Sequence, residues 1–156
     1  DGGEWGEVGG NFVKSLALYD GMRALNYDVL TLGGRELESA LWDSLVADGR
    51  SAGVLVGNLQ TPKTAASGNG FTPRSHLIVE RNGMKVAVIS VWSESTANSR
   101  SKVQLTPAEI FLRERLRDTK KADARLVVLY GSSEQAGALA TKFPEVDRRM
   151  EISSIV

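Results

Sequence analysis

Candidate functional residues lie where apolar runs of this sequence end in glycine. The clearest case is the segment 27–36, YDVLTLGGRE, in which an apolar run reaches a glycine pair and continues directly into Arg35 and Glu36. A second apolar run ends in a glycine that is followed by Asn58. Glycine lets a ligand approach the main chain closely, and open α/β sheets bind ligands at the carboxyl ends of their strands. Arg35, Glu36 and Asn58 are therefore candidate ligand-binding residues.

Two interpretations of the charged residues remain open. A guanidinium at a strand end, such as that of Arg35, can bind an anionic group with its planar fork. Alternatively, Arg35 and Glu36 form a solvent-exposed pair that contributes little to stability. Glu4, in the glycine-rich opening DGGEW, is either a carboxylate ligand or a solvated residue of a turn. His76 is the single histidine, and we expect a structural residue rather than a metal ligand.

Composition limits the classes of function that the chain can have. Its 156 residues are 42% hydrophobic and 24% charged, which predicts a single globular domain spanning 1–156 with a core of its own. Nineteen basic residues balance nineteen acidic ones, so no overall field would attract nucleic acid. The absence of cysteine excludes disulfides, thiolate nucleophiles and cysteine metal ligands. No apolar run is long enough to span a membrane.

Short and alternating apolar runs predict the strands that must position these side chains. They occur at 29–32, 54–56, 76–80, 84–91 and 125–130. We expect these strands to share one sheet with helices packed against it, which is a layered α/β fold. Asn82 and Gly83, between two of the strands, predict a tight type I′ turn because both residues tolerate a positive φ. The segment 60–73 has no periodicity and predicts a surface loop.

Apolar residues at helical spacing predict four helices. They cover 11–26, 37–47, 106–120 and 134–142. Buried faces are expected from Phe12, Leu16, Tyr19, Met22 and Leu25 in the first helix and from Ile110, Phe111, Leu112 and Leu116 in the third. Thr106 and Glu109 predict a capping box, with Pro107 at the first helical position. Ser132 or Ser133 is expected to cap the last helix.

The order of strand ends and loops resembles the calcineurin-like metallophosphoesterases, and in particular their 5'-nucleotidase branch. In that family "YD-x-x-x-x-G-N-H-E" corresponds to 27–36, and "D-x-G-D" corresponds to the opening DGGE. The run RNGMKVAVISV at 81–91 is similar to the family's central hairpin, and GNL at 57–59 is similar to its "A-N-L". The resemblance implies a metallophosphoesterase-like sheet flanked by helices, and we expect the natural chain to begin before Asp1.

The same resemblance implies that the family's metal site has been lost. Its enzymes use two divalent metals to activate water and to clamp phosphate oxygens, and such metals need imidazole or carboxylate ligands. Here only Glu4 keeps a carboxylate at a metal-binding position of the family. The other positions that can be matched hold Gly34, Arg35, Gly131, Ser153 and Ile155. We therefore expect no catalytic residue, no metal site and no cofactor.

Two functions remain open at this point. The first is a non-catalytic structural or partner-binding subunit, with a protein partner or self-assembly and with no nucleic acid. The second is a divalent-metal-dependent phosphoester (nucleotide) hydrolase with an atypical site. A plain doubly wound nucleotide-binding protein ranks below both, since no glycine-rich phosphate fingerprint follows a first strand. Family members are often exported, so the resemblance implies a periplasmic or extracellular location.

Overall fold

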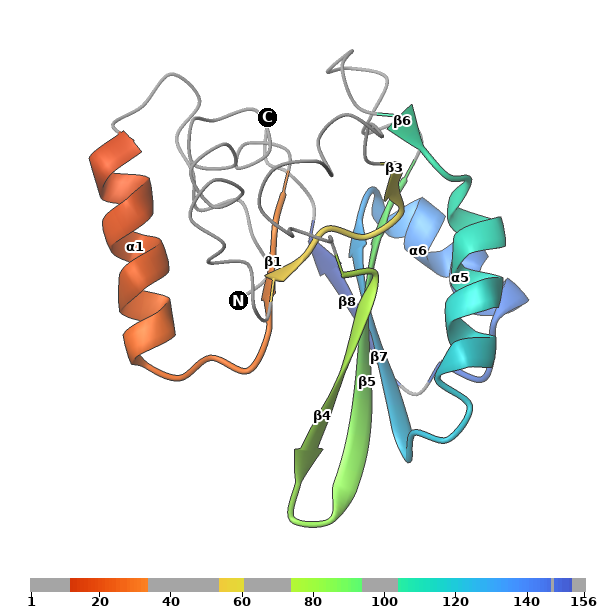
Figure 1. Ribbon diagram of the computed structural model, residues 1–156. Coiled ribbons are helices and arrows are strands. Elements are labelled where there is room, and N and C mark those ends of the chain that lie inside the picture. Colours follow the sequence, from red (N-terminus) through yellow and green to blue (C-terminus); the bar gives the residue numbers. More distant parts are fainter. Residues whose placement is uncertain (1–11, 34–53, 61–73, 94–103, 147, 153–156) are drawn as a thin grey trace. The chain divides into compact units, whose positions relative to one another are not determined.

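The computed structural model describes residues 12–33, 54–60, 74–93, 104–146 and 148–152 (Figure 1). These residues form a mixed α/β structure with three helices and small sheets. The chain divides into two compact units, and each is described by itself below. The first consists of Asp1–Val54 and Thr61–Pro73, and the second of Leu55–Gln60 and Arg74–Val156. Within the described ranges, no helix is long and apolar enough to cross a membrane.

The first unit contains helix α1 (Phe12–Ala24) and strand β1 (Leu30–Thr31). The helix expected at 11–26 is confirmed, and Tyr19 is buried on it as predicted. The expected burial of Leu25 is wrong, because the helix ends before it and the residue is 73% exposed. Asn26 follows with φ of 56°, a left-handed conformation that asparagine adopts readily and that ends helices.

The second unit is built on a four-stranded sheet in the order β4-β5-β7-β8. Its strands are β4 (His76–Arg81), β5 (Met84–Trp92), β7 (Ala124–Tyr130) and β8 (Arg148–Ile152). β4 runs antiparallel to β5, whereas β5, β7 and β8 are parallel. Parallel neighbours need crossover connections, and here those connections carry helices α5 (Ala108–Asp118) and α6 (Ser133–Lys142).

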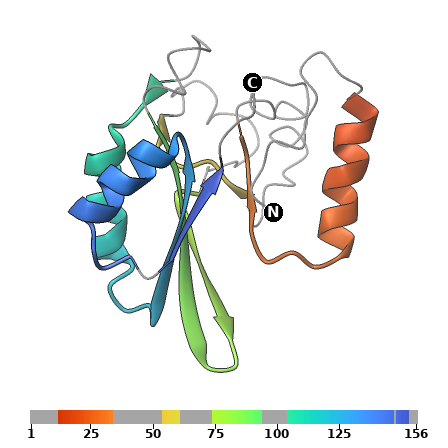
Figure 2. The ribbon, with the colours of Figure 1, turned by 180° about the vertical axis from the view of Figure 1, so that it is seen from behind.

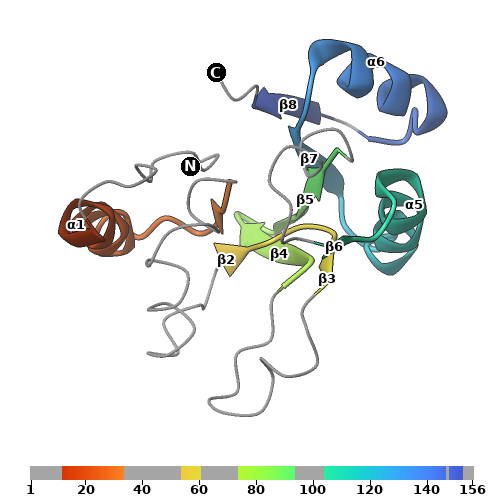
Figure 3. The ribbon, with the colours of Figure 1, turned by 90° about the horizontal axis from the view of Figure 1, so that it is seen from above.

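Both helices of the second unit cover the same face of its sheet (Figures 1 and 3). Side chains alternate between the two faces of a strand, and the odd-numbered residues of β5 and β7 point toward the helices. The core on this face includes Ile89, Val91, Phe111, Leu112, Leu116, Val127, Leu129 and Ala136. Phe111, Leu112 and Leu116 are buried as predicted, but Ile110 is 53% exposed because it lies on the other side of α5.

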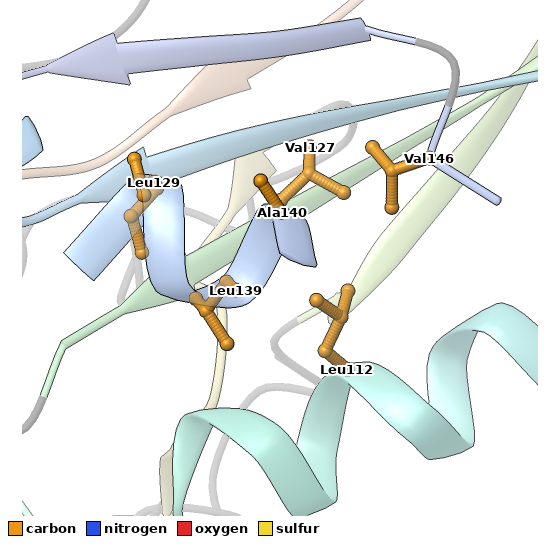
Figure 4. A pocket seen from close by; sticks show the side chains of 7 residues that line it. Leu112, Val127, Leu129, Leu139, Ala140 and Val146 are labelled. Atoms are coloured by element: carbon orange, nitrogen blue, oxygen red, sulfur yellow. The ribbon is translucent and has the colours of Figure 1, made fainter. Parts of the chain in front are cut away.

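A small pocket lies within this core, between α5, α6 and β7 (Figure 4). Aliphatic side chains line it throughout: Leu112, Val127, Leu129, Ala136, Leu139, Ala140 and Val146. No lining side chain carries a hydrogen-bonding or ionisable group, so the pocket offers nothing that would orient a polar ligand. It is a packing feature of the core rather than a candidate for chemistry.

The predicted hairpin is confirmed. β4 and β5 pair with Arg81 opposite Met84, and the two residues between them make the turn. Asn82 has φ of 52° and Gly83 has φ of 77°, the positive values that a type I′ turn requires. Figure 2 shows the hairpin from behind, with its turn extending past the ends of α5 and α6.

The predicted caps have different outcomes. Ser132 caps α6 as expected, since its hydroxyl accepts a hydrogen bond from the Gln135 N–H and the Gln135 side chain accepts one from the Ser132 N–H. The capping box expected from Thr106 is wrong: the N-cap of α5 is Pro107, with no side-chain hydrogen bond. Glu109 instead binds Arg113 and Lys142, at 3.2 and 2.6 Å.

The expectation of one sheet with all five predicted strands is also wrong for two of them. β1 and β2 (Val54–Leu55) are two-residue strands that the four-stranded sheet does not include. Val56 follows β2, and Gly57, with φ of 67°, then turns the chain. β3 (Leu59–Gln60) then pairs antiparallel with β6 (Gln104–Leu105). The helix expected at 37–47 and residues 61–73 of the loop expected at 60–73 lie outside the described residues. Gln60 lies in β3 and not in a loop.

Two glycine substitutions, expected to change the free energy of unfolding in opposite directions, test this description of the backbone. Gly137 lies exposed inside α6, with open space where a Cβ would be. We expect Gly137→Ala to raise the free energy of unfolding by about 1 kcal/mol, because alanine loses less entropy in a helix. Gly83→Ala also meets no neighbour, but its positive φ should lower the free energy by about 1–2 kcal/mol. Urea unfolding measures both, and equal effects would contradict the assigned turn.

Candidate functional site

The carboxyl end of β5 meets the segment 57–58 in the second unit, and Asn58 connects it to Thr106, just before α5. Its Nδ2 donates hydrogen bonds to the Trp92 carbonyl at 3.1 Å and to the Thr106 carbonyl at 2.6 Å. Its Oδ1 accepts a hydrogen bond from the Trp92 N–H at 2.7 Å. The Thr106 N–H also donates to the Asn58 carbonyl, at 2.9 Å. Asn58 is 2% exposed, so this is a buried polar junction.

Gly57, the residue before this junction, lies directly against β5. A Cβ at this position would stand 3.0 Å from the Ser90 carbonyl oxygen and 3.3 Å from Cδ1 of Trp92. The positive φ of Gly57 is a second reason for glycine here. In the structure, the space beside Gly57 holds the main chain and an aromatic ring of β5.

The face of β5 that points away from α5 and α6 carries buried polar and aromatic groups. Ser90 and Trp92 are on it, and the Trp92 ring lies against Tyr130 of β7, with ring centroids 5.5 Å apart. Within the described part of the chain, Ser90 Oγ and Trp92 Nε1 are buried without a hydrogen-bond partner. Leaving such groups unpaired costs free energy. No pattern in the sequence had indicated these two groups.

Gly131, at the carboxyl end of β7, is the described position where the family resemblance implies a histidine metal ligand. A Cβ here would stand 2.7 Å from Oε1 of Gln135 and 3.0 Å from both Cβ and Oγ of Ser93. A side chain at this position would require the end of the Gln135 side chain to move and Ser93 to shift slightly. The Gln135 oxygen is already held by the Ser132 N–H at 2.8 Å, as part of the α6 cap. Gly131 itself has no side chain that could bind a metal.

Of the predicted ligand-binding residues, only Asn58 lies in the part of the chain that the structure describes. Glu4, Arg35 and Glu36 lie outside the described residues, as do Gly34, Ser153 and Ile155, so their roles stay predictions. Among the residues that the structure does describe, no group of three or more histidine, aspartate or glutamate side chains could hold a metal ion. Asn58 is described, and both ends of its amide bind main-chain groups. A ligand-binding role for it also stays a prediction.

A second polar cluster, which sequence reasoning missed, joins α5 to the start of β4. Arg115 Nη1 donates to Ser75 Oγ at 3.1 Å, and Ser75 Oγ lies 3.3 Å from Nδ1 of His76. The same guanidinium pairs with Asp118 at 3.1 Å and lies over the Phe111 ring. Partial burial and the charge of Arg115 lower the pKa of His76, and the Asp118 carboxylate opposes them. Ser75 and Arg115 are 40 residues apart.

The comparisons with known proteins place this chain by its fold alone. No protein-family model matches the sequence, and no curated protein matches it. Among solved structures, NAD nucleotidase of Haemophilus influenzae matches with a TM-score of 0.65 and 20% identity, over 83% of this chain and 24% of that one. A putative 5'-nucleotidase of Staphylococcus aureus matches with a TM-score of 0.65 and 19% identity, over 88% of this chain and 31% of that one.

The 5'-nucleotidase precursor of Thermus thermophilus is also similar, with a TM-score of 0.58 and 18% identity over 76% of this chain. The chain spans about a quarter to a half of the lengths of the structures it matches, from 24% to 47%. Identities this low show a shared fold and no more. The structure therefore resembles 5'-nucleotidase and metallophosphoesterase-like proteins over part of their length, as the sequence motifs had predicted.

Replacing Asn58 tests the importance of the buried junction. Asn58→Ala would leave one buried N–H and two buried carbonyls without their partner, and each such group costs about 1–3 kcal/mol. We expect the free energy of unfolding to fall by about 3 kcal/mol or more. Gln60→Ala is the matched control, since Gln60 is exposed and its hydrogen bond to Thr106 is 3.5 Å long. Similar urea midpoints for both variants would contradict the assignment.

The lowered pKa of His76 makes stability depend on pH. The unfolded chain has the ordinary value of 6.5 at this residue, so between the folded pKa and 6.5 it binds more protons than the folded chain does. The free energy of unfolding should therefore fall as the pH is lowered through this window. Urea unfolding of the monomer in dilute solution, at about pH 7.5 and about pH 5.5, measures the slope. His76→Gln should have a shallower slope, and an unchanged one would refute this cause.

Proposed function

We propose that this chain is a non-catalytic metallophosphoesterase-like domain that works by contact with protein rather than by turnover. The observation that carries the proposal is the packing around Gly131. In a two-metal phosphoesterase, imidazole and carboxylate side chains at the strand ends hold the metals that activate water. At the end of β7 this chain has Gly131, which offers no ligand, and Ser93 and Gln135 lie close to the position that a Cβ would take.

The fold around that position supports the same proposal. Gln135 completes the capping box of α6, so its side chain stabilises the helix that packs on the sheet. The amide of Asn58, at the neighbouring strand end, is engaged by the main chain of Trp92 and Thr106. Polar groups at these two strand ends are thus used to hold the protein's own segments together. A fold that is kept without its catalytic groups is best explained if its surfaces still bind a protein partner.

A hydrolase with an atypical site is the second candidate. The solved structures that resemble this chain include proteins described as nucleotidases and as a phosphatase, and this similarity favours phosphoester chemistry. Such a site would depend on Glu4, Arg35 and Glu36, which lie outside the described residues. Export to the periplasm or the extracellular space remains part of the proposal for either function.

Hydrolysis assays discriminate between the two candidates. The purified chain should not hydrolyse nucleoside monophosphates or an aryl phosphate when manganese, zinc or magnesium is added, because too few ligands remain to hold two metals. An authentic 5'-nucleotidase in the same assay provides the positive control, and elemental analysis of the preparation measures bound metal. Turnover that disappears in Glu4→Ala or Arg35→Ala, or about two metals per chain, would overturn the non-catalytic proposal.

A further inference from the structure

Strand β4 lies at one edge of the four-stranded sheet in the second unit. Among the described residues it pairs through its length with β5 alone, and its opposite edge has no strand against it. Figures 1 and 2 show the hairpin of β4 and β5 extending beyond α5 and α6, so these helices do not cover its turn end. An unpaired edge presents a row of main-chain donors and acceptors that can pair with another strand.

Hydrogen bonds of Lys85 establish which residues of β4 face outward. The Lys85 carbonyl accepts from the Asp123 N–H at 2.8 Å, and the Lys85 N–H donates to the Asp123 carboxylate at 2.7 Å. Lys85 stands opposite Glu80, so this pair is not hydrogen-bonded within the hairpin. The pattern alternates along antiparallel strands. The N–H and C=O groups of Glu80, Ile78 and His76 therefore point away from β5.

The open edge has a definite length and a definite centre. On one side it is limited by Arg74, whose carbonyl accepts a hydrogen bond from the Val56 N–H and which forms a bridge with Leu55. On the other side it is limited by the turn that begins at Asn82. Ile78 is midway between Arg74 and Asn82. An antiparallel strand that fills this edge symmetrically must therefore be centred opposite Ile78.

We propose that this edge pairs with the same edge of a second copy of this chain, antiparallel, with the two-fold axis at Ile78. In this register, Ile78 lies opposite Ile78 of the partner subunit, and His76 lies opposite Glu80 of the partner subunit. Each outward-facing residue of one strand then meets an outward-facing residue of the other, so all of their main-chain groups are paired. The result is one continuous sheet of eight strands across the two copies.

The side chains of the edge suit this pairing. Ile78 is 49% exposed, and the pairing would bring two such side chains together at the centre. The imidazole of His76 can donate a hydrogen bond to the carboxylate opposite it, and the two-fold axis repeats this contact. Sheet edges are often protected by proline or by charged residues, especially lysine. The sequence of β4, HLIVER, has no proline or lysine, and its charged residues are Glu80 and Arg81. A register shifted toward Arg74 would compete with the bond that Arg74 already makes to Val56.

This inference rests on the proposed function, since it names a second copy as the protein partner, but it is measured separately from hydrolysis. A dimer that hydrolyses phosphoesters would overturn only the non-catalytic proposal. An inactive chain that stays monomeric would overturn only the pairing.

Cysteine cross-linking tests the register, because the natural sequence contains no cysteine. In Ile78→Cys, the two Cα atoms across the axis should be about 5.5 Å apart, which a disulfide can bridge. In Glu80→Cys they should be at least about 13 Å apart, since four residues of strand separate them. Mild oxidation should give a covalent dimer of Ile78→Cys and little of Glu80→Cys. No dimer of Ile78→Cys, or equal cross-linking of both, overturns the pairing.

Sedimentation equilibrium tests the association without a cross-link. The natural chain should form dimers, and Ile78→Lys should weaken them by at least about tenfold, because it places two like charges at the axis. Met84→Lys is the matched control: Met84 is 54% exposed on the same hairpin but lies on β5, away from the open edge. A natural chain that remains monomeric up to about 1 mM, or equal effects of both variants, contradicts the proposal.

Discussion

The buried carboxamide of Asn58 is the contact on which the arrangement of the second unit depends. It binds main-chain groups of Trp92 and Thr106, which are 34 and 48 residues away in the sequence. Strand pairing alone would hold this region weakly, because β3 and β6 contribute only two residues each. A buried main-chain group needs a hydrogen-bond partner. The amide therefore fixes the turn after Gly57, the end of β5 and the entry to α5 together.

The same requirement applies at the carboxyl ends of β5 and β7. In an open α/β sheet they are the usual place for a ligand. Here the space beside Gly57 holds the main chain of Ser90, and the space beside Gly131 holds Ser93 and Gln135. The contact with Gln135 also belongs to the cap of α6. The Gln135 side chain beside Gly131 thus also stabilises the start of a helix.

The two edges of strand β4 differ in their contacts. One edge pairs with β5, and the start of the strand is anchored from the helix side, where Arg115 of α5 reaches Ser75. Partial burial of this cluster disfavours charge on His76, and the guanidinium of Arg115 acts in the same direction. Because this anchoring uses side chains on one face and not the outer edge, the main-chain groups around Ile78 are left available for another strand.

The sequence by itself determined the structures that local interactions specify. The hairpin at Asn82 and Gly83, the helices α5 and α6 and the strand β7 all follow from periodicity and turn chemistry within a few residues. Only the tertiary structure decided the use of Asn58, the close contacts beside Gly131 and the hydrogen bond from Arg115 to Ser75. The cap expected at Thr106 does not form, and the main-chain N–H and carbonyl of Thr106 both bind Asn58 instead. These outcomes depend on hydrogen bonds and close contacts between residues that are distant in sequence, and no local pattern encodes them.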